Sequence, residues 1–260
     1  MSKDVKKNKF LKKITGILGY KIFNKNFIKS ERILNSNTLK IDEILNNICV
    51  NNNFKKIIQL GANDGISDDF MFSIIKKNNI SAILLEPLNE NFIKLKKNYS
   101  DYKNVTILKK AVDIKDGKRK IYKINNDYYD YYKKKYNTEN GDWINVLASF
   151  DKKHLLEHGI KMSHISEEEV DSISIKNVIE KNNFQDFNLL VSDIEGYDYE
   201  IIIELLSHTN YRPCIVFEWV HMNERKIFEV CEILKKENYI LIKINKDLVC
   251  INKNNIKLNF

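Results

Sequence analysis

The chain has 260 residues, of which 43 % are hydrophobic, so it is long enough for one globular domain with a sizeable core. With only 2 prolines and 8 glycines, it is not built from long disordered linkers. The formal net charge of +8 favours an anionic partner, such as nucleic acid, an anionic lipid surface or a phosphorylated substrate, unless lysine serves here only as a solubilising residue.

Several classes of protein are excluded by what the sequence lacks. No RNA- or DNA-binding motif with interleaved aromatic residues stands out, so we expect no nucleic-acid partner. No apolar run approaches the roughly 20 residues of a membrane span, and the first residues do not form a signal peptide, so we expect a cytoplasmic protein. The four cysteines form no CxxC pair and are expected to be buried thiols rather than zinc ligands: Cys49, Cys214, Cys231 and Cys250.

Residues 1–52 predict a basic helical extension at the N-terminus. Leu11, Ile14 and Leu18 lie three and four positions apart among several lysines, which places them on one face of a helix. Such a helix makes either a weak peripheral contact with a membrane or an ordinary packing contact with the domain that follows.

Residues 53–260 predict a single α/β domain in which strands alternate with helices. The apolar runs expected as buried parallel strands are 56–60, 81–85, 105–108, 189–192 and 214–217. Two further runs, 239–243 and 248–251, lie close enough in sequence to pair as antiparallel strands. The pattern predicts a Rossmann-like, doubly wound, mostly parallel sheet of seven strands with a C-terminal antiparallel strand pair.

Two connecting segments carry specific expectations. Ser67 is placed to cap a helix whose first turn holds Asp68 and Asp69. Residues 122–165 interrupt the alternation with a cluster of tyrosines and lysines at 128–136, and we expect an insertion over the carboxyl-terminal edge of the sheet. Because ligands of such folds bind at that edge, the insertion either shapes a substrate pocket or is a surface excursion without a role.

A turn and two acidic residues predict a site for an adenosine-containing cofactor. The turn follows the first strand and consists of Gly61, Ala62, Asn63, Asp64 and Gly65. Glycines there allow a tight turn and close approach of a ligand to the main chain. Glu86 ends the second strand about 20 residues later, where a carboxylate accepts hydrogen bonds from ribose hydroxyls. Asp113 follows the third strand, where the adenine would lie.

The charges around this turn favour S-adenosylmethionine over a dinucleotide. A dinucleotide prefers a glycine-rich loop that opens directly into a helix N-terminus, where its pyrophosphate binds. Here the loop and the expected helix start are acidic, which suits a cationic sulfonium ligand better than a pyrophosphate. Tyr129 and Lys133 have the four-residue spacing of a reductase pair, so an NAD-dependent reductase stays open as an alternative.

Acidic residues and a histidine after the fourth and fifth strands are the candidates for catalysis. Asp193 and Glu195 follow the fourth strand, Glu218 ends the fifth, and His221 comes three residues later. A carboxylate among them can take the proton from a hydroxyl as it attacks the methyl group. Alternatively, Asp193 with Glu218 and His221 holds a divalent ion that chelates substrate oxygens.

In these segments the sequence resembles the FkbM family of methyltransferases. The resemblance rests on residues 60–65, 86–87, 111–112, 170–174, 193–197 and 216–218, and on 148–151 with His154 and His158. It implies S-adenosylmethionine as the methyl donor and a hydroxyl acceptor, often on a sugar or polyketide. We expect Ser149, His154 and Tyr197 to contact the substrate. Where many members have a lysine before the aspartate, this chain has Ser192.

These observations predict an O-methyltransferase that acts on a carbohydrate. The basic charge and the tyrosine-rich insertion favour a phosphorylated or nucleotide-linked sugar or glycan, and the resemblance suggests a bacterial capsule or lipopolysaccharide pathway. Besides the reductase, the remaining alternative is a non-catalytic, membrane-associated scaffold that binds S-adenosylmethionine.

Overall fold

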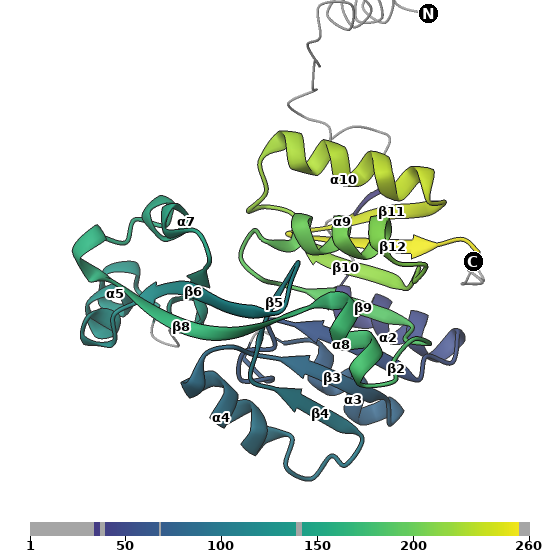
Figure 1. The fold of residues 1–260 in the computed structure, drawn as a ribbon, viewed down its shortest axis with the longest axis horizontal. Coiled ribbons are helices and arrows are strands. Elements are labelled where there is room, and N and C mark those ends of the chain that lie inside the picture. The colour runs from purple at the N-terminus through teal and green to yellow at the C-terminus, as the bar shows by residue number, and fades with distance from the viewer. Residues whose placement is uncertain (1–33, 37–39, 68, 139–141, 255–260) are drawn as a thin grey trace, which may run out of the picture.

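The computed structural model describes residues 34–36, 40–67, 69–138 and 142–254 (Figure 1). Most of the predicted basic extension, including Leu11, Ile14 and Leu18, therefore lies outside the described residues. From the segment 1–52 the structure describes strand β1 (Leu34–Ser36) and helix α2 (Ile41–Asn51).

The main sheet has eight strands among the described residues, in the order β1-β11-β12-β10-β9-β2-β3-β4. The strands after β1 are β2 (Lys56–Leu60), β3 (Ser81–Leu85), β4 (Val105–Leu108), β9 (Leu189–Ser192), β10 (Cys214–Glu218), β11 (Tyr239–Ile244) and β12 (Asp247–Asn252). The sequence-predicted seven-stranded, mostly parallel sheet is confirmed, and so is its antiparallel closing pair, β11 with β12. The structure adds β1, which pairs in parallel with β11 at the edge.

Helices cover both faces of this sheet, which explains the continuous apolar runs of the central strands (Figure 1). Side chains that alternate along β2, β3, β9 and β10 enter two separate cores. One core is formed with α8 (Ile175–Lys181), α9 (Asp198–His208) and α10 (Glu224–Lys236). The other is formed with α2, α3 (Met71–Asn78) and α4 (Asn89–Asn98). Because the strands between these two cores are parallel, their carboxyl ends lie at one edge of the sheet.

The insertion is larger than predicted and has a sheet of its own. Its strands, in the order β5-β8-β6-β7, are β5 (Ala111–Asp113), β8 (Ile165–Ser174), β6 (Gly117–Ile124) and β7 (Ala148–Ser149). Its helices are α5 (Tyr129–Tyr136), α6 (Asp142–Val146) and α7 (Lys152–Glu157), with 3₁₀ turns at Asn126–Tyr128 and Met162–His164. The expected bounds 122–165 missed β6 and β8 because these strands carry lysines and glutamates that pair across the sheet, such as Lys118 with Glu169 and Lys120 with Glu167.

The tyrosine–lysine cluster of 128–136 forms the core of the insertion rather than a ligand surface. Tyr132 is fully buried, accepts a hydrogen bond from the Lys161 amide at 2.8 Å, and lies 3.0 Å from His164 Nδ1. Tyr128, Tyr129 and Tyr136 pack against the same core. The rings of Tyr128, Tyr132 and Tyr136 stack on one another or on His164, so these three tyrosines serve the packing of the insertion.

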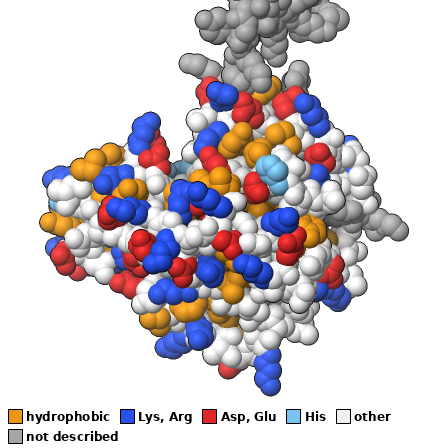
Figure 2. All heavy atoms as spheres, in the orientation of Figure 1, with side chains coloured by type: hydrophobic (Ala, Val, Ile, Leu, Met, Phe, Trp, Pro, Cys, Tyr) orange, Lys and Arg blue, Asp and Glu red, His pale blue; other side chains and the backbone are white. Residues whose placement is uncertain are grey.

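Two surface properties bear on the expected partners. Figure 2 shows lysines and arginines interspersed with aspartates and glutamates on the face in view, so the positive charge does not gather there into one basic patch. Within the described part of the chain, every helix is too short or too polar to cross a lipid bilayer.

Candidate active site

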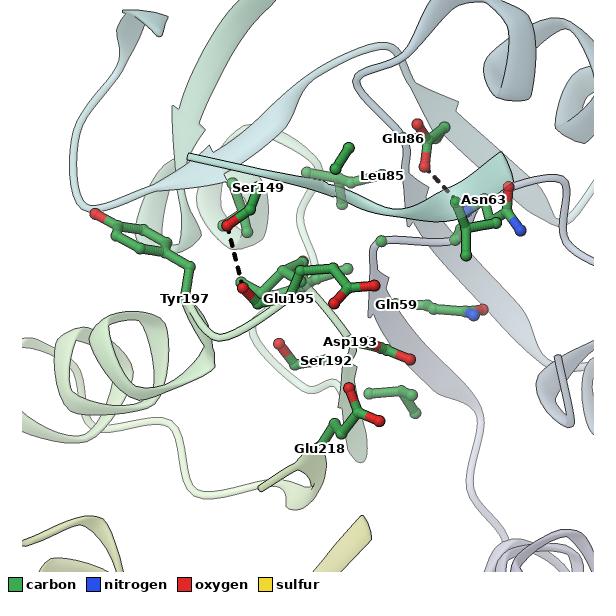
Figure 3. A pocket seen from close by; sticks show the side chains of 18 of the residues that line it. Gln59, Asn63, Leu85, Glu86, Ser149, Ser192, Asp193, Glu195, Tyr197 and Glu218 are labelled. Atoms are coloured by element: carbon green, nitrogen blue, oxygen red, sulfur yellow. Dashed lines mark hydrogen bonds between the residues drawn. The ribbon is translucent and has the colours of Figure 1, made fainter. Parts of the chain in front are cut away.

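A cavity of about 600 Å³ lies at the carboxyl ends of β2, β3, β9 and β10 (Figure 3). Its floor and sides come from the turn after β2, from Glu86 after β3, and from the segments that follow β9 and β10. The insertion closes it from above with Trp143, residues 146–150 and His158. This volume matches that of a site for a cofactor or a small molecule. The insertion is therefore a wall of the pocket rather than an excursion without a role.

The turn after β2 and Glu86 face the same end of this cavity. Gly61 has a φ of +73°, and a Cβ atom there would lie 2.0 Å from the backbone oxygen of Asp193. The amides of Gly61 and Ala62 both donate to the Leu85 carbonyl, which joins the turn to the end of β3. The Asn63 amide donates to Glu86 Oε2 at 3.0 Å (Figure 3). The turn and Glu86 therefore meet at the cavity, and their role in binding an adenosine stays a prediction.

Burial controls the electrostatics of Glu86. Its side chain is 5 % exposed and accepts hydrogen bonds from the amides of Asn63 and Leu88. Desolvation outweighs these hydrogen bonds and raises the pKa of Glu86 to about 7. Each carboxylate oxygen uses one lone pair for a backbone amide, which leaves the others to accept hydrogen bonds from a ligand in the cavity.

Three residues of the predicted cofactor set do not line the cavity. Asp64 accepts hydrogen bonds from the Ile66 and Ser67 amides and from the Ser67 hydroxyl, so it stabilises the turn internally. Gly65 lies against Leu95 and Tyr99, which leave no space for a Cβ atom.

Asp113 corrects the prediction most clearly. It belongs to β5 of the small sheet rather than to the end of a main-sheet strand, and it is fully buried. Arg119 pairs with it at 3.0 Å, and the Tyr197 hydroxyl donates to it at 2.7 Å. Because its carboxylate is occupied by these partners, Asp113 does not contact an adenine; its neighbours Ala111 and Val112 line the cavity instead.

The helix after the turn also starts later than predicted. Helix α3 begins at Met71, and the Ser67 side chain does not cap it, because its hydroxyl donates to Asp64. Asp69 accepts hydrogen bonds from the Met71 amide and from Gln59 Nε2. Gln59 and Asp69 both line the cavity, and of the two Gln59 was not predicted as a site residue. Gln59 lies within an apolar strand, and the local sequence does not indicate that this part of the strand borders a cavity.

Asp193 lines the cavity directly after β9, where its backbone packs against the turn at Gly61 (Figure 3). Its side chain is 48 % exposed to the cavity, and Lys246 Nζ approaches its Oδ2 to 4.0 Å. Desolvation within the cavity, together with the carboxylates of Glu218 and Glu195, raises the pKa of Asp193 well above its ordinary value. Lys246, from the turn between β11 and β12, also lies 3.4 Å from Glu218 Oε1.

Lys246 supplies a positive charge beside Asp193, although Ser192 stands where many family members have a lysine. The Ser192 hydroxyl is buried and donates to Asp198 Oδ1 at 2.6 Å, so it does not face Asp193. The ammonium group beside Asp193 comes instead from the other end of the chain. Sequence reasoning missed Lys246 because it is one of 43 basic residues, and only the folding of β12 beside β10 brings it to the site.

The remaining predicted residues meet where the insertion contacts the main domain. His154 Nε2 lies 2.8 Å from Glu195 Oε2, and the Ser149 hydroxyl donates to the Glu195 carbonyl. His221 Nε2 lies 3.1 Å from Glu218 Oε2. Ser149 and Tyr197 line the cavity, as predicted for substrate contacts, whereas His154 does not line it and acts on it only through Glu195.

The predicted metal set of Asp193, Glu218 and His221 is not assembled as expected. Among the described residues, the potential ligand atoms that approach one another within 4.8 Å belong to Glu195, Glu218 and His221, and to His154, His158 and His221. Asp193 is in neither group, and the cation beside it is Lys246.

Comparison with known proteins identifies the class and then the family. The strand order β4-β3-β2-β9-β10-β12-β11, with β12 antiparallel, is that of class I S-adenosylmethionine-dependent methyltransferases. The model of the methyltransferase FkbM domain matches residues 59–241, well over half of the chain. The protein therefore belongs to the FkbM methyltransferase family, and S-adenosylmethionine is the cofactor that this family implies.

Solved structures with similarity to the chain include three methyltransferases. The FkbM methyltransferase from Methylobacillus flagellatus is 13 % identical, with a TM-score of 0.45 over 76 % of this chain and 44 % of that one. The precorrin-6y C5,15-methyltransferase from Geobacter metallireducens is 11 % identical, with a TM-score of 0.37 over 85 % and 93 %. An S-adenosylmethionine-dependent O-methyltransferase from Thermotoga maritima is 9 % identical, with a TM-score of 0.37 over 90 % and 66 %.

The match covers less than half the length of the Methylobacillus protein. No curated protein matches the sequence significantly.

Replacing Glu86 by glutamine should weaken the binding of S-adenosylhomocysteine by about 10- to 100-fold at pH 8, since a hydrogen bond to an ionised group contributes about 1.5–3 kcal/mol. In the unsubstituted protein the affinity should fall as the pH drops through about 7, where Glu86 takes up a proton. The affinity of Glu86→Gln should not change over this range. Calorimetric titrations at pH 6 and pH 8 measure both effects.

The same substitution should change the pH dependence of stability. The unfolded chain ionises this carboxyl near pH 4.5 and the folded protein only near 7, so the unsubstituted fold loses stability as the pH rises between these values. Glu86→Gln removes that loss. The melting temperature of Glu86→Gln minus that of the unsubstituted protein should therefore be larger at pH 8 than at pH 5. A melting difference that is the same at both values would contradict the raised pKa.

Proposed function

We propose that the protein transfers a methyl group from S-adenosylmethionine to a hydroxyl group of a carbohydrate. The observation that carries the proposal is one cavity lined by two chemically different groups. The turn at Gly61–Asn63 and the buried Glu86 offer main-chain and carboxylate contacts to an adenosine. Asp193, whose backbone packs against that turn, presents a carboxylate to the same space.

Asp193 is placed to act as the base in this reaction. The acceptor oxygen attacks the methyl carbon, the bond from that carbon to sulfur breaks, and the proton of the hydroxyl passes to Asp193. Methylated product and S-adenosylhomocysteine then remain. Much of the rate would come from holding oxygen, carbon and sulfur in line within the closed cavity. The Lys246 ammonium balances the charge of Asp193 and Glu218.

The walls of the acceptor end support a sugar. Trp143 contributes an aromatic ring, on which the apolar face of a sugar ring can pack, while His158 offers a hydrogen bond. Lys110 and Lys246 line the cavity and suit a phosphate group, which favours a phosphorylated or nucleotide-linked sugar. A bacterial capsule or lipopolysaccharide pathway is the context that the family resemblance suggests.

The reductase alternative finds no support in the site. Tyr129 and Lys133 lie on α5 and are not among the residues that line the cavity. Helix α3 begins six residues after Gly65, so the glycine turn does not open directly into a helix N-terminus that would bind a pyrophosphate.

Mass spectrometry of sugar products tests the proposal. The protein and S-adenosylmethionine are incubated with a panel of nucleotide-linked, phosphorylated and free sugars, and each product is searched for the gain of one methyl group. We expect one member to be methylated on oxygen, with no reaction of its deoxy analogue that lacks this hydroxyl. Methylation only on nitrogen or carbon acceptors would overturn the proposal while leaving the methyltransferase family intact.

A further inference from the structure

Three histidines from distant parts of the sequence meet beside the cavity. His154 and His158 belong to the insertion, and His221 follows β10 in the main domain. The ring centroids are 4.5 Å apart for His154 and His158, 4.7 Å for His154 and His221, and 5.2 Å for His158 and His221. One potential ligand nitrogen of each lies within 4.8 Å of the other two. Three of the chain's 5 histidines thus face one point.

Helix α7 presents two of these imidazoles on the same side. His154 and His158 are four residues apart, the spacing at which helical side chains share a face. His158 Nδ1 lies 2.9 Å from the His154 carbonyl oxygen, which can only accept a hydrogen bond. Nδ1 of His158 therefore carries the proton, and Nε2 carries the lone pair. A metal-binding histidine is typically oriented in this way, with its second nitrogen donating to a backbone carbonyl.

Glu195 places a carboxylate oxygen beside two of the three histidines. Its Oε2 lies 2.8 Å from His154 Nε2 and 3.6 Å from His221 Nε2. Glu195 has a φ of +54°, a left-handed conformation that is unfavourable for a residue with a side chain and that concentrates at functional sites. The Ser149 hydroxyl donates to its carbonyl oxygen, which holds this strained residue against the insertion.

The surrounding charge is negative. The carboxylates of Glu195, Glu218 and Asp198 all act on Asp193 from nearby. Lys246 pairs with Asp193 and Glu218, and His154 pairs with Glu195. A divalent cation at the histidine cluster would balance part of this negative charge.

We propose that His154, His158, His221 and Glu195 bind one divalent transition-metal ion. Three imidazoles and a carboxylate are the ligands that Zn²⁺ and its neighbours in the first transition series prefer. Ligand atoms around a tetrahedral Zn²⁺ lie about 3.4 Å apart for bonds of about 2.1 Å, so the side chains, and above all Glu195 and His158, would have to rotate toward one another to close the set. His158, His221 and Glu195 line the cavity, which leaves the ion open to a ligand there.

This site differs from the one predicted from the sequence and goes beyond the proposed function. In the proposed ligand set, Glu195 and two histidines of the insertion take the place of Asp193 and Glu218. An ion bound there would connect the insertion to the main domain. An ion here would face the acceptor end of the cavity. Its presence does not depend on which acceptor is methylated, so it can be tested without any turnover.

A cobalt titration of the metal-free, full-length protein without an affinity tag tests the site. Co²⁺ in a tetrahedral site gives visible absorption bands that report both stoichiometry and ligand geometry. We expect one Co²⁺ per chain, displaced by one equivalent of Zn²⁺. His158→Gln should weaken the affinity by more than the roughly 10- to 100-fold that loss of a second-shell partner costs, since it removes a ligand.

His208→Gln is the matched control. His208 is 64 % exposed and pairs with Glu204 on its own helix, away from the cluster, so its loss should leave the titration unchanged. Circular dichroism of the metal-free variants verifies that each is folded. If the unsubstituted protein gives no saturable bands, or if its titration matches that of folded His158→Gln, the metal site is wrong and the histidines form only a hydrogen-bonded contact. Neither result would bear on S-adenosylhomocysteine binding.

Discussion

Replacing Gly61 by alanine should abolish S-adenosylhomocysteine binding and lower the free energy of unfolding by about 3 kcal/mol or more. The new Cβ atom would lie 2.0 Å from the backbone oxygen of Asp193, and the φ of +73° is itself unfavourable for alanine. Either the turn moves away from β9 or β9 moves away from β2, and both changes open the cavity. Chemical denaturation and calorimetric titration measure the two effects.

Gly117→Ala is the control that separates the cost of a positive φ from the cost of a steric clash of the new Cβ atom. Gly117 also has a positive φ, of +155°, but nothing lies within 4 Å of the Cβ atom it would gain. This variant should lose only about 1 kcal/mol and keep its affinity for the donor. Equal losses in the two variants would show that the close contact between the turn and Asp193 does not hold the site together.

Asp193→Asn should lower kcat by about 100- to 10,000-fold, because the amide cannot take up the proton of the attacking hydroxyl. Binding of S-adenosylhomocysteine should change little, since asparagine has nearly the same size as aspartate and leaves Glu86 and the amides of the turn in place. Single-turnover methylation of the acceptor found by mass spectrometry measures the first effect. Calorimetry measures the second.

The comparison with Glu86→Gln makes this test specific. Glu86→Gln should reduce donor affinity and retain most of kcat at saturating donor, which is the reverse of the pattern for Asp193→Asn. A loss of donor affinity in Asp193→Asn as large as that in Glu86→Gln would place Asp193 in the donor site. Unchanged turnover in folded Asp193→Asn would remove it as the base.

The main sheet could be predicted from the sequence because its strands are buried on both faces. Continuous apolar runs at 56–60, 81–85 and 189–192 are typical of parallel strands that are covered on both faces, and these three pair with one another in the sheet. The turn at Gly61 and the position of Glu86 followed from the same strands, since parallel strands end at one edge of the sheet.

The small sheet and much of the acceptor end could not be predicted in this way. Strands β6 and β8 expose lysine and glutamate side chains on one face, so their pattern resembles that of a loop. Asp113 looked like the end of a main-sheet strand, but β4 ends at Leu108 and the chain then enters the small sheet. Lys246 and His158 reach the site only through tertiary packing, which leaves no local signal in the sequence.

Calorimetric titration of the full-length protein with S-adenosylhomocysteine tests the central claim, that one cavity places the turn at Gly61 and the buried Glu86 around the same nucleoside. We predict one molecule bound per chain, much weaker binding to Glu86→Gln at pH 8, and no heat from NAD. The account would be contradicted if the unsubstituted protein did not bind S-adenosylhomocysteine, or if Glu86→Gln bound it with unchanged affinity.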